Sequence, residues 1–329
     1  MSPHPREIAI PAGLPYDPFR ESLYTREELM DGWPGETLDG RIERHVLDHG
    51  FRAPPTGEAL AQRLHDHAID VALSRFLCAD PRTKVVGIMG SAATPRTDPW
   101  YRRVAELARV LARAGFLVAS GGGPGSMEAA NLGAFLAGHE DGALDQALDV
   151  LSRAPAYEDD PRPYMAAAAE ARDLLGPGAP SIAIPTWFYP HEPVGQFATH
   201  VAKYFANSIR EDGLLAIAVA GVVFAPGRAG TLQELFQDAA QNAYGTHGRS
   251  PMVLFGSEHY AGEPSIHELL LDQARRFGGY ERLVTLADEP EEALAFLERN
   301  EPSETLAALR GCDAQDMLGF LRNERIRAR

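Results

Sequence analysis

The sequence predicts an α/β protein with a doubly wound, mainly parallel, Rossmann-like sheet and an N-terminal helical extension. From residue 84 onward, short apolar runs alternate with helix-like segments, which favours parallel strands joined by right-handed crossovers. Two of the apolar runs lead directly into glycine-rich turns that open helices. With 329 residues, of which 45% are hydrophobic, the chain can bury one large core with extensions, or two domains.

Residues 1–80 predict a helical extension that packs on the main domain. Prolines make the start irregular, and amphipathic helices are expected over 38–49 and 57–77. Asp80-Pro81 closes the region. The apolar face of these helices is too small to form an independent core.

Residues 81–300 predict the Rossmann-like domain, and residues 301–329 a C-terminal helical tail. Apolar runs predict strands at 85–89, 116–119, 181–185, 219–225, 252–255 and 283–286. Helices are expected at 98–114, 126–137, 196–215, 231–243, 265–277 and 289–297. A mainly helical insert at about 138–180 interrupts the alternation, with helices at 141–152 and 164–175.

Two glycine-rich loops are the most informative local features. The first runs Gly121-Gly122-Gly123-Pro124-Gly125-Ser126-Met127-Glu128, and the second runs Pro226-Gly227-Arg228-Ala229-Gly230-Thr231-Leu232-Gln233-Glu234. A turn without side chains that enters a helix presents backbone N–H groups and the positive end of the helix dipole, which suits a phosphate. Because both loops follow predicted parallel strands, they are expected to hold a phosphorylated nucleotide at the carboxyl edge of the sheet.

With both loops placed, roughly residues 84–298 resemble the LOG ("lonely guy") family, whose members are often mislabelled as lysine decarboxylases. Gly90-Ser91 after the first strand and Arg210 on the helix before the second loop's strand also fit the family pattern. Each loop alone is a weak signal, whereas their combined spacing is specific for the fold.

The resemblance implies an enzyme that hydrolyses the N-glycosidic bond of a nucleoside 5′-monophosphate, releasing free base and ribose 5-phosphate. It implies that Glu234 and Arg210 are catalytic, that the chain forms a homodimer or higher homo-oligomer, and that neither metal nor organic cofactor is needed. The expected nucleotide- and phosphate-binding residues are Gly90, Ser91, Gly122, Gly123, Gly125, Glu128, Gly227, Arg228, Gly230 and Thr231.

Each polar candidate also has a purely structural interpretation. Glu234 has the spacing of a capping box with Thr231, and Thr231 itself resembles an ordinary N-cap. Arg210 precedes Glu211 and Asp212 and could form a surface ion pair with either. Glu128 could be a carboxylate that only stabilises the start of its helix.

Arg228 departs from the family pattern, because it stands where the family has the second glycine of its Pro-Gly-Gly loop. If that position needs a positive φ, a bulky residue is strained there. The arginine could bind phosphate, or it could block the site. The alternative function is therefore a non-catalytic nucleotide-binding sensor or regulatory protein. A Rossmann oxidoreductase is disfavoured because the first loop lacks Gly-x-Gly-x-x-Gly spacing.

Composition excludes several other classes. A net charge of −15 disfavours binding to nucleic acid or to anionic lipid. No run reaches the roughly 18 apolar residues of a membrane span, and the first residues lack a secretory signal, so a cytoplasmic location is expected.

Metal and pyridoxal phosphate are likewise not expected. The lysines, Lys84 and Lys203, lack the flanking motif of a pyridoxal phosphate site. Cys78 and Cys312 form no Cys-x-x-Cys pair. His65 and His67 point apart on a helix and are expected at the surface.

Overall fold

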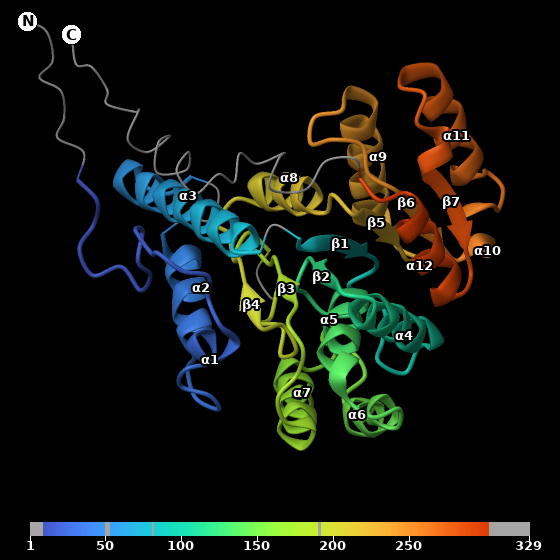
Figure 1. The fold of residues 1–329 in the computed structure, drawn as a ribbon. Coiled ribbons are helices and arrows are strands. Elements are labelled where there is room, and N and C mark those ends of the chain that lie inside the picture. The colour runs from blue at the N-terminus through green and yellow to red at the C-terminus, as the bar shows by residue number, and fades with distance from the viewer. Residues whose placement is uncertain (1–8, 50–52, 81, 190–191, 303–329) are drawn as a thin grey trace, which may run out of the picture.

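The computed structural model describes residues 9–49, 53–80, 82–189 and 192–302. Within them lies one seven-stranded sheet in which all neighbouring strands are parallel, in the order β4-β3-β2-β1-β5-β6-β7 (Figure 1). The strands are β1 Lys84–Met89, β2 Phe116–Ser120, β3 Ile182–Ala183, β4 His200–Val201, β5 Gly221–Phe224, β6 Met252–Phe255 and β7 Val284–Ala287. The predicted fold class is confirmed.

Helices cover both faces of the sheet, and the strand residues divide between them by alternation. Val86 and Ile88 of β1 belong to one buried cluster, whereas Val85 and Met89 belong to the other. The first face carries α4 Pro99–Arg113, α5 Ser126–Phe135, α6 Ala143–Leu151, α7 Pro161–Leu175 and α12 Pro290–Arg299. The second carries α1 Arg26–Leu29, α2 Leu38–Asp48, α3 Thr56–Cys78, α8 Asn207–Ile217, α9 Ala229–Tyr244 and α11 Ile266–Phe277. Shorter elements are α10 Ser257–Tyr260 and the 3₁₀ turns η1 Leu136–Gly138 and η2 Glu281–Leu283.

The direction of winding reverses beside β1. The chain first builds β2, β3 and β4 on one side of β1 and then returns to place β5 on its other side. Met89 at the end of β1 pairs with Phe224 at the end of β5. The loops that leave these two strands therefore diverge from neighbouring points, which is where doubly wound sheets hold their ligands.

The sheet edge at β4 differs from the sequence prediction, which placed residues 196–215 in helices. His200–Val201 instead pairs with β3, and α8 begins only at Asn207. Val201 also exchanges backbone hydrogen bonds with Tyr24 of the N-terminal region. A two-residue strand is too short to show a period-2 pattern, so its pairing is visible only in three dimensions.

The N-terminal helices are joined to the sheet through buried polar groups. His65 and Asp66 of α3 are fully buried, so the expectation that this segment lies at the surface is wrong for both. Tyr24 Oη lies 2.8 Å from His65 Nε2, and the Asp66 carboxylate accepts hydrogen bonds from the N–H groups of Phe205 and Ala206. Asp66 thereby fixes the chain immediately before α8 and so helps to set the position of that helix.

In Figure 1 the N-terminal helices lie beside β3 and β4, at the opposite end of the sheet from β7. The predicted C-terminal helical tail falls largely outside the described residues. Among the helices that the structure describes, none has the length and apolar character needed to cross a membrane.

Candidate functional site

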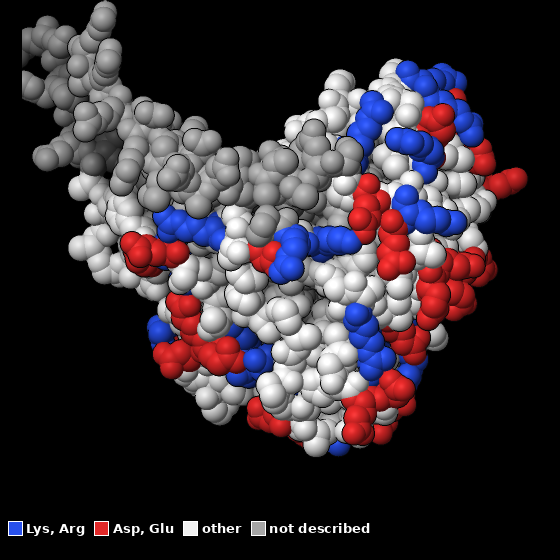
Figure 2. All heavy atoms as spheres, in the orientation of Figure 1, with Lys and Arg blue, Asp and Glu red and all other residues white. Residues whose placement is uncertain are grey.

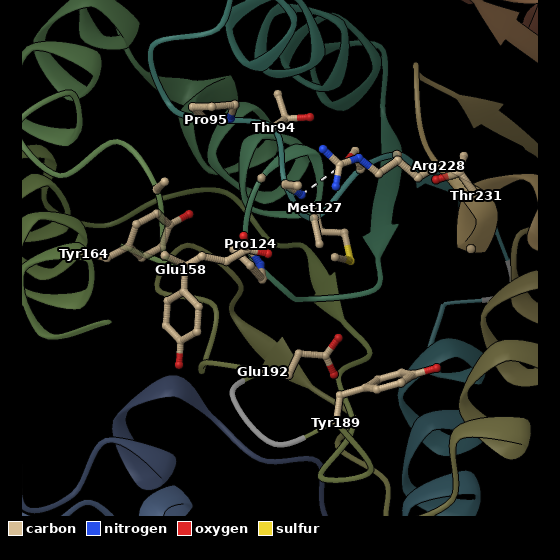
Figure 3. Close-up of a pocket in the computed structure, with 18 of the residues that line it drawn as sticks. Thr94, Pro95, Pro124, Met127, Glu158, Tyr164, Tyr189, Glu192, Arg228 and Thr231 are labelled. Atoms are coloured by element: carbon tan, nitrogen blue, oxygen red, sulfur yellow. Dashed lines mark hydrogen bonds between the residues drawn. The ribbon is translucent and has the colours of Figure 1, made fainter. Parts of the chain in front are cut away.

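A cavity of about 560 Å³ lies where the loops after β1, β2 and β5 meet. Gly90 and Ser91 reach it from the first loop, Gly125 from the second, and Gly230 and Thr231 from the third. Figure 3 shows Arg228 and Thr231 on one side of this cavity, Tyr164 and Glu158 on another, and Glu192 and Tyr189 on a third. The two glycine-rich loops therefore converge on one space.

Arg210 and Glu234, the two expected catalytic residues, lie together in this cavity. Arg210 projects from α8 and Glu234 from α9, and Arg210 Nη1 lies 3.6 Å from Glu234 Oε1. Arg210 is only 6% exposed, and its Nε has no hydrogen-bond partner among the described residues. The two groups are thus close enough to interact electrostatically, yet a direct hydrogen bond at ideal length is not formed.

The structural alternatives for these two residues are not observed. The capping-box interpretation of Glu234 is wrong, because α9 begins at Ala229 with Arg228 as its N-cap and without a side-chain cap. The surface ion pair of Arg210 with Glu211 or Asp212 is also wrong, because the buried guanidinium faces Glu234 and Glu192 instead.

Glu192 is a second acidic group beside Arg210, and the sequence did not single it out. Its Oε1 lies 3.7 Å from Arg210 Nη2, and its Oε2 accepts a 2.7 Å hydrogen bond from the N–H of Thr186. The first glycine-rich loop packs against it, since a Cβ on Gly123 would lie 3.2 Å from Glu192 Oε1. One guanidinium therefore stands between two carboxylates.

Burial raises the pKa of both carboxyl groups. The pKa of Glu234 is raised to about 7, mainly because the side chain is removed from water, while Arg210 opposes the rise. The pKa of Glu192 is raised for the same main reason, again opposed by Arg210. Perturbed acids that line a cavity are typical of functional sites. Glu234 can exchange a proton near neutral pH.

The second loop forms a compact turn around the start of α9. Gly227 packs directly on the Thr231 side chain, which is only 4% exposed. Gly230 and Thr231 line the cavity, whereas Gly227 does not and acts as support. A helix N-terminus that opens into a cavity in this way is suited to a phosphate group.

The loops after β1 and β2 are fixed to each other. Gly125 has a φ of +67° and lies so close to Ser91 that a Cβ would collide with the Ser91 carbonyl oxygen. That carbonyl accepts a hydrogen bond from Ser126 N–H, and Gly90 packs on the Ser126 side chain.

Gly122, with a φ of +75°, packs against Ala183 and Pro185. Gly90, Ser91 and Gly125 line the cavity, whereas Gly122 and Gly123 do not.

Arg228 has an unstrained backbone, with φ −105° and ψ −158°. This position therefore does not require a positive φ. Its side chain is exposed and makes no hydrogen bond or ion pair with the rest of the described chain. Figure 3 shows its guanidinium extending over the cavity in the direction of Thr94. Arg228 lies at the rim and leaves the space between the loops open.

Glu128, expected to contact the nucleotide, is instead enclosed in a buried network. Arg96 donates to it from Nε and Nη2 at 2.8 and 2.6 Å, and the hydroxyls of Tyr101 and Tyr164 donate at 2.8 and 2.7 Å. Its side chain is 5% exposed and does not line the cavity. The network fixes the start of α5 against α4 and α7 rather than presenting a carboxylate to a ligand.

The insert contributes one wall of the cavity. Pro155, Ala156, Tyr157, Glu158 and Tyr164 all line it, and Arg96 holds this wall by donating to the carbonyl oxygens of Ala154 and Tyr164. Tyr189 adds a half-exposed ring whose hydroxyl accepts from Asn207 Nδ2 at 3.1 Å. Trp187, two residues before Tyr189, is buried and does not line the cavity; its Nε1 donates to Asp39 Oδ1.

The described residues contain no group of three or more histidine, cysteine or acidic side chains placed to hold a metal ion. The cavity lining offers glutamates at Glu158, Glu192, Glu211 and Glu234 and guanidinium groups at Arg210 and Arg228. Acid–base and electrostatic chemistry are what this set of side chains can supply.

Three solved structures resemble the chain over about two thirds of its length. TM1055 is 21% identical with a TM-score of 0.44, and the match covers 66% of this chain and 99% of TM1055. The molybdenum cofactor carrier protein of Chlamydomonas reinhardtii is 18% identical with a TM-score of 0.42, covering 66% and 98%. The molybdenum cofactor binding protein of the phototrophic bacterium Rippkaea orientalis is 16% identical with a TM-score of 0.41, covering 66% and 97%. A comparison with curated proteins finds no match.

A family model described as the SLOG cluster4 family matches residues 83–142. This segment begins one residue before β1 and includes β1, α4, β2, the first glycine-rich loop and α5. It thus contains Gly90, Ser91 and Gly125, three of the residues that line the cavity. The resemblance to LOG-like proteins is thereby confirmed, with residues 83–142, which include the first glycine-rich loop, matching the SLOG cluster4 family.

Proposed function

We propose that the protein hydrolyses the N-glycosidic bond of a nucleoside 5′-monophosphate to give the free base and ribose 5-phosphate. The observation that carries this proposal is the placement of Arg210 and Glu234, 3.6 Å apart, in a cavity that both glycine-rich loops border. A phosphate-binding helix start, a buried guanidinium and a carboxylate of perturbed pKa are the groups that this reaction needs in one place.

The phosphate would bind at the start of α9. Backbone N–H groups at Gly230 and Thr231 and the dipole of a 16-residue helix favour an anion there. Arg228 at the rim adds a positive charge, and its planar guanidinium can donate two parallel hydrogen bonds to phosphate oxygens. This anchor would direct the ribose toward Glu234, one turn further along α9.

At the ribose, ionised Glu234 would take a proton from a water molecule whose oxygen bonds to the anomeric carbon. The bond from that carbon to the base nitrogen breaks, and its electron pair leaves with the base. Positive charge develops on the sugar as the bond breaks, and a carboxylate nearby stabilises it. Arg210 keeps part of the Glu234 population ionised because it opposes the rise in pKa.

The departing base needs a proton, and we assign the role of donor to Glu192. Burial raises the pKa of Glu192, which favours the protonated form. Tyr189 and the insert residue Tyr157 would border the base. The two glutamates would thus take the two complementary roles of acid and base on either side of Arg210.

A second candidate function is a nucleotide-binding sensor without turnover. Arg228 favours it. Arginine in place of the glycine expected from the resemblance adds a possible contact with phosphate, but it adds no catalytic group. The resemblance also leads us to propose a homodimer or higher homo-oligomer, which sedimentation velocity would test.

Release of free base from a panel of purine, pyrimidine and N6-substituted monophosphates, followed by chromatography, tests the proposed function. Binding without release across the panel would favour the sensor.

A further inference from the structure

A second cavity of about 480 Å³ lies at the other end of the sheet, away from the glycine-rich loops. Val219 precedes β5 and Leu283 precedes β7, so this cavity opens at the amino ends of the strands. Its walls come from the turn after α9, from η2 and from the last turn of α12. It is therefore separate from the candidate catalytic site.

Arginines from three different elements line this cavity. Arg249 lies between α9 and β6, Arg282 in η2 and Arg299 at the end of α12. None of them forms an ion pair within the part of the chain that the structure describes. Glu301, the acidic residue of the lining, is already paired with Lys84. The chain as a whole carries a net charge of −15, so this local excess of positive charge runs against its composition.

The three guanidinium groups are exposed, so water and salt screen much of their mutual repulsion, and Arg299 Nε also donates to the carbonyl oxygen of Ala295. Figure 2 shows several basic side chains, with acidic ones among them, on the part of the molecular surface where Figure 1 places α9 and α11. An anion that bridged the three arginines would remove the repulsion and gain charge-assisted hydrogen bonds.

The shape of the cavity suits a small ligand rather than an extended polymer. Tyr280, Val219 and Leu283 are buried and form an apolar floor. Gly245 and Gly279 border the cavity with positive φ values and open space on their Cβ side. A bounded volume of this size is within the range of small-molecule sites.

We propose that this cavity binds a small polyanion that carries phosphate groups, at a site distinct from the nucleotide cavity. Arg249, Arg282 and Arg299 bind the phosphate oxygens. A long nucleic acid is not the ligand, because the strongly acidic surface elsewhere on the chain repels it. The proposal does not depend on whether the other cavity hydrolyses nucleotides.

Inorganic pyrophosphate is the probe, titrated into the full chain by calorimetry at low ionic strength. The test variant is the double substitution Arg282→Gln and Arg299→Gln. The matched control is Arg275→Gln, which neutralises an exposed arginine on α11 that does not line the cavity. Arg228→Gln weakens any binding at the nucleotide cavity and leaves the second cavity unchanged, so heat that falls in this variant comes from the nucleotide cavity.

The native protein and Arg275→Gln should bind pyrophosphate equally, and the double variant should lose on the order of tenfold or more in affinity. Binding should weaken as salt is added. Identical isotherms for the double variant and the native protein would overturn the proposal, as would tighter binding of single-stranded DNA than of pyrophosphate through these arginines.

Folding of the variants is checked by circular dichroism and thermal unfolding. Removing like charges should leave the unfolding midpoint unchanged or raise it slightly. If the double variant does not fold, Arg249→Gln replaces it, because this residue lies in an exposed turn. Native affinity in that variant would count against the proposal.

Discussion

Arg210 of α8 and Glu234 of α9 face each other within one cavity, with Arg210 Nη1 3.6 Å from Glu234 Oε1. Because this separation is longer than a good hydrogen bond, each group retains capacity to bind a ligand or a water molecule. Glu192 lies on the other side of the same guanidinium, at 3.7 Å. One guanidinium thus lies within 4 Å of two carboxylates, so changing any of the three side chains should alter the other two.

The pH dependence of turnover should follow Glu234. Its pKa is raised to about 7, and the proposed mechanism needs the ionised form. The value of kcat/KM should therefore rise with pH up to about 7 and fall about tenfold per unit below it. Arg210→Gln should move this midpoint to higher pH, because Arg210 lowers the pKa of Glu234. A profile that is flat between pH 5 and 8 would contradict the assignment of Glu234 as the base.

Replacing Glu192 with Gln should remove the proton donor while keeping the side chain's size. We expect kcat for base release to fall by roughly a hundredfold or more, with little change in nucleotide affinity. Glu158→Gln is the control. Glu158 also lines the cavity, but it is exposed and lies on a different side of the cavity from Glu192 (Figure 3). Equal kcat values for both variants would show that Glu192 has no role in proton transfer.

Glu128→Gln should destabilise the fold, because it leaves the buried guanidinium of Arg96 without its counter-charge. We expect a loss of about 3 kcal/mol in the free energy of unfolding, measured with urea. Glu170→Gln breaks the exposed pair with Arg153 and should cost less than about 1 kcal/mol. If the two losses were equal, the buried network would not be the element that holds the insert against the sheet.

Arg228→Gly introduces the residue that the resemblance to the LOG family leads one to expect at this position. The backbone is already in an extended conformation, so the fold should be unaffected. Because Arg228 contacts only the phosphate in the proposed complex, KM for a nucleoside monophosphate should rise while kcat remains nearly constant. A large rise in kcat would mean instead that Arg228 obstructs the site.

The strands and glycine-rich loops were predictable because their signals are local. Each strand except β4 is built around a short apolar run, and each loop is a glycine-rich segment directly before or at the start of a helix. The convergence of Arg210 and Glu234 was predictable only through the resemblance, since α8 and α9 are separated by β5 and their contact depends on the order of the strands.

Glu192 and the Arg96–Glu128 network were not predictable in the same way. Glu192 lies in an irregular segment with no motif around it. Its carboxylate becomes a candidate only once the fold places Gly123 and Arg210 beside it. Arg96, Tyr101 and Tyr164 come from three separate segments, with no periodicity that relates them. The burial of His65 was missed because the N-terminal helices pack on the sheet more extensively than their composition indicates.

The central claim is tested most directly by the Glu234→Gln variant in the base-release assay. The native protein should release free base and ribose 5-phosphate from at least one nucleoside 5′-monophosphate. Glu234→Gln should bind that nucleotide with similar affinity and release base at least about a hundredfold more slowly, with Glu268→Gln on α11 as the surface control. Undiminished release by Glu234→Gln, or no release by the native protein from any member of the panel, would contradict the account.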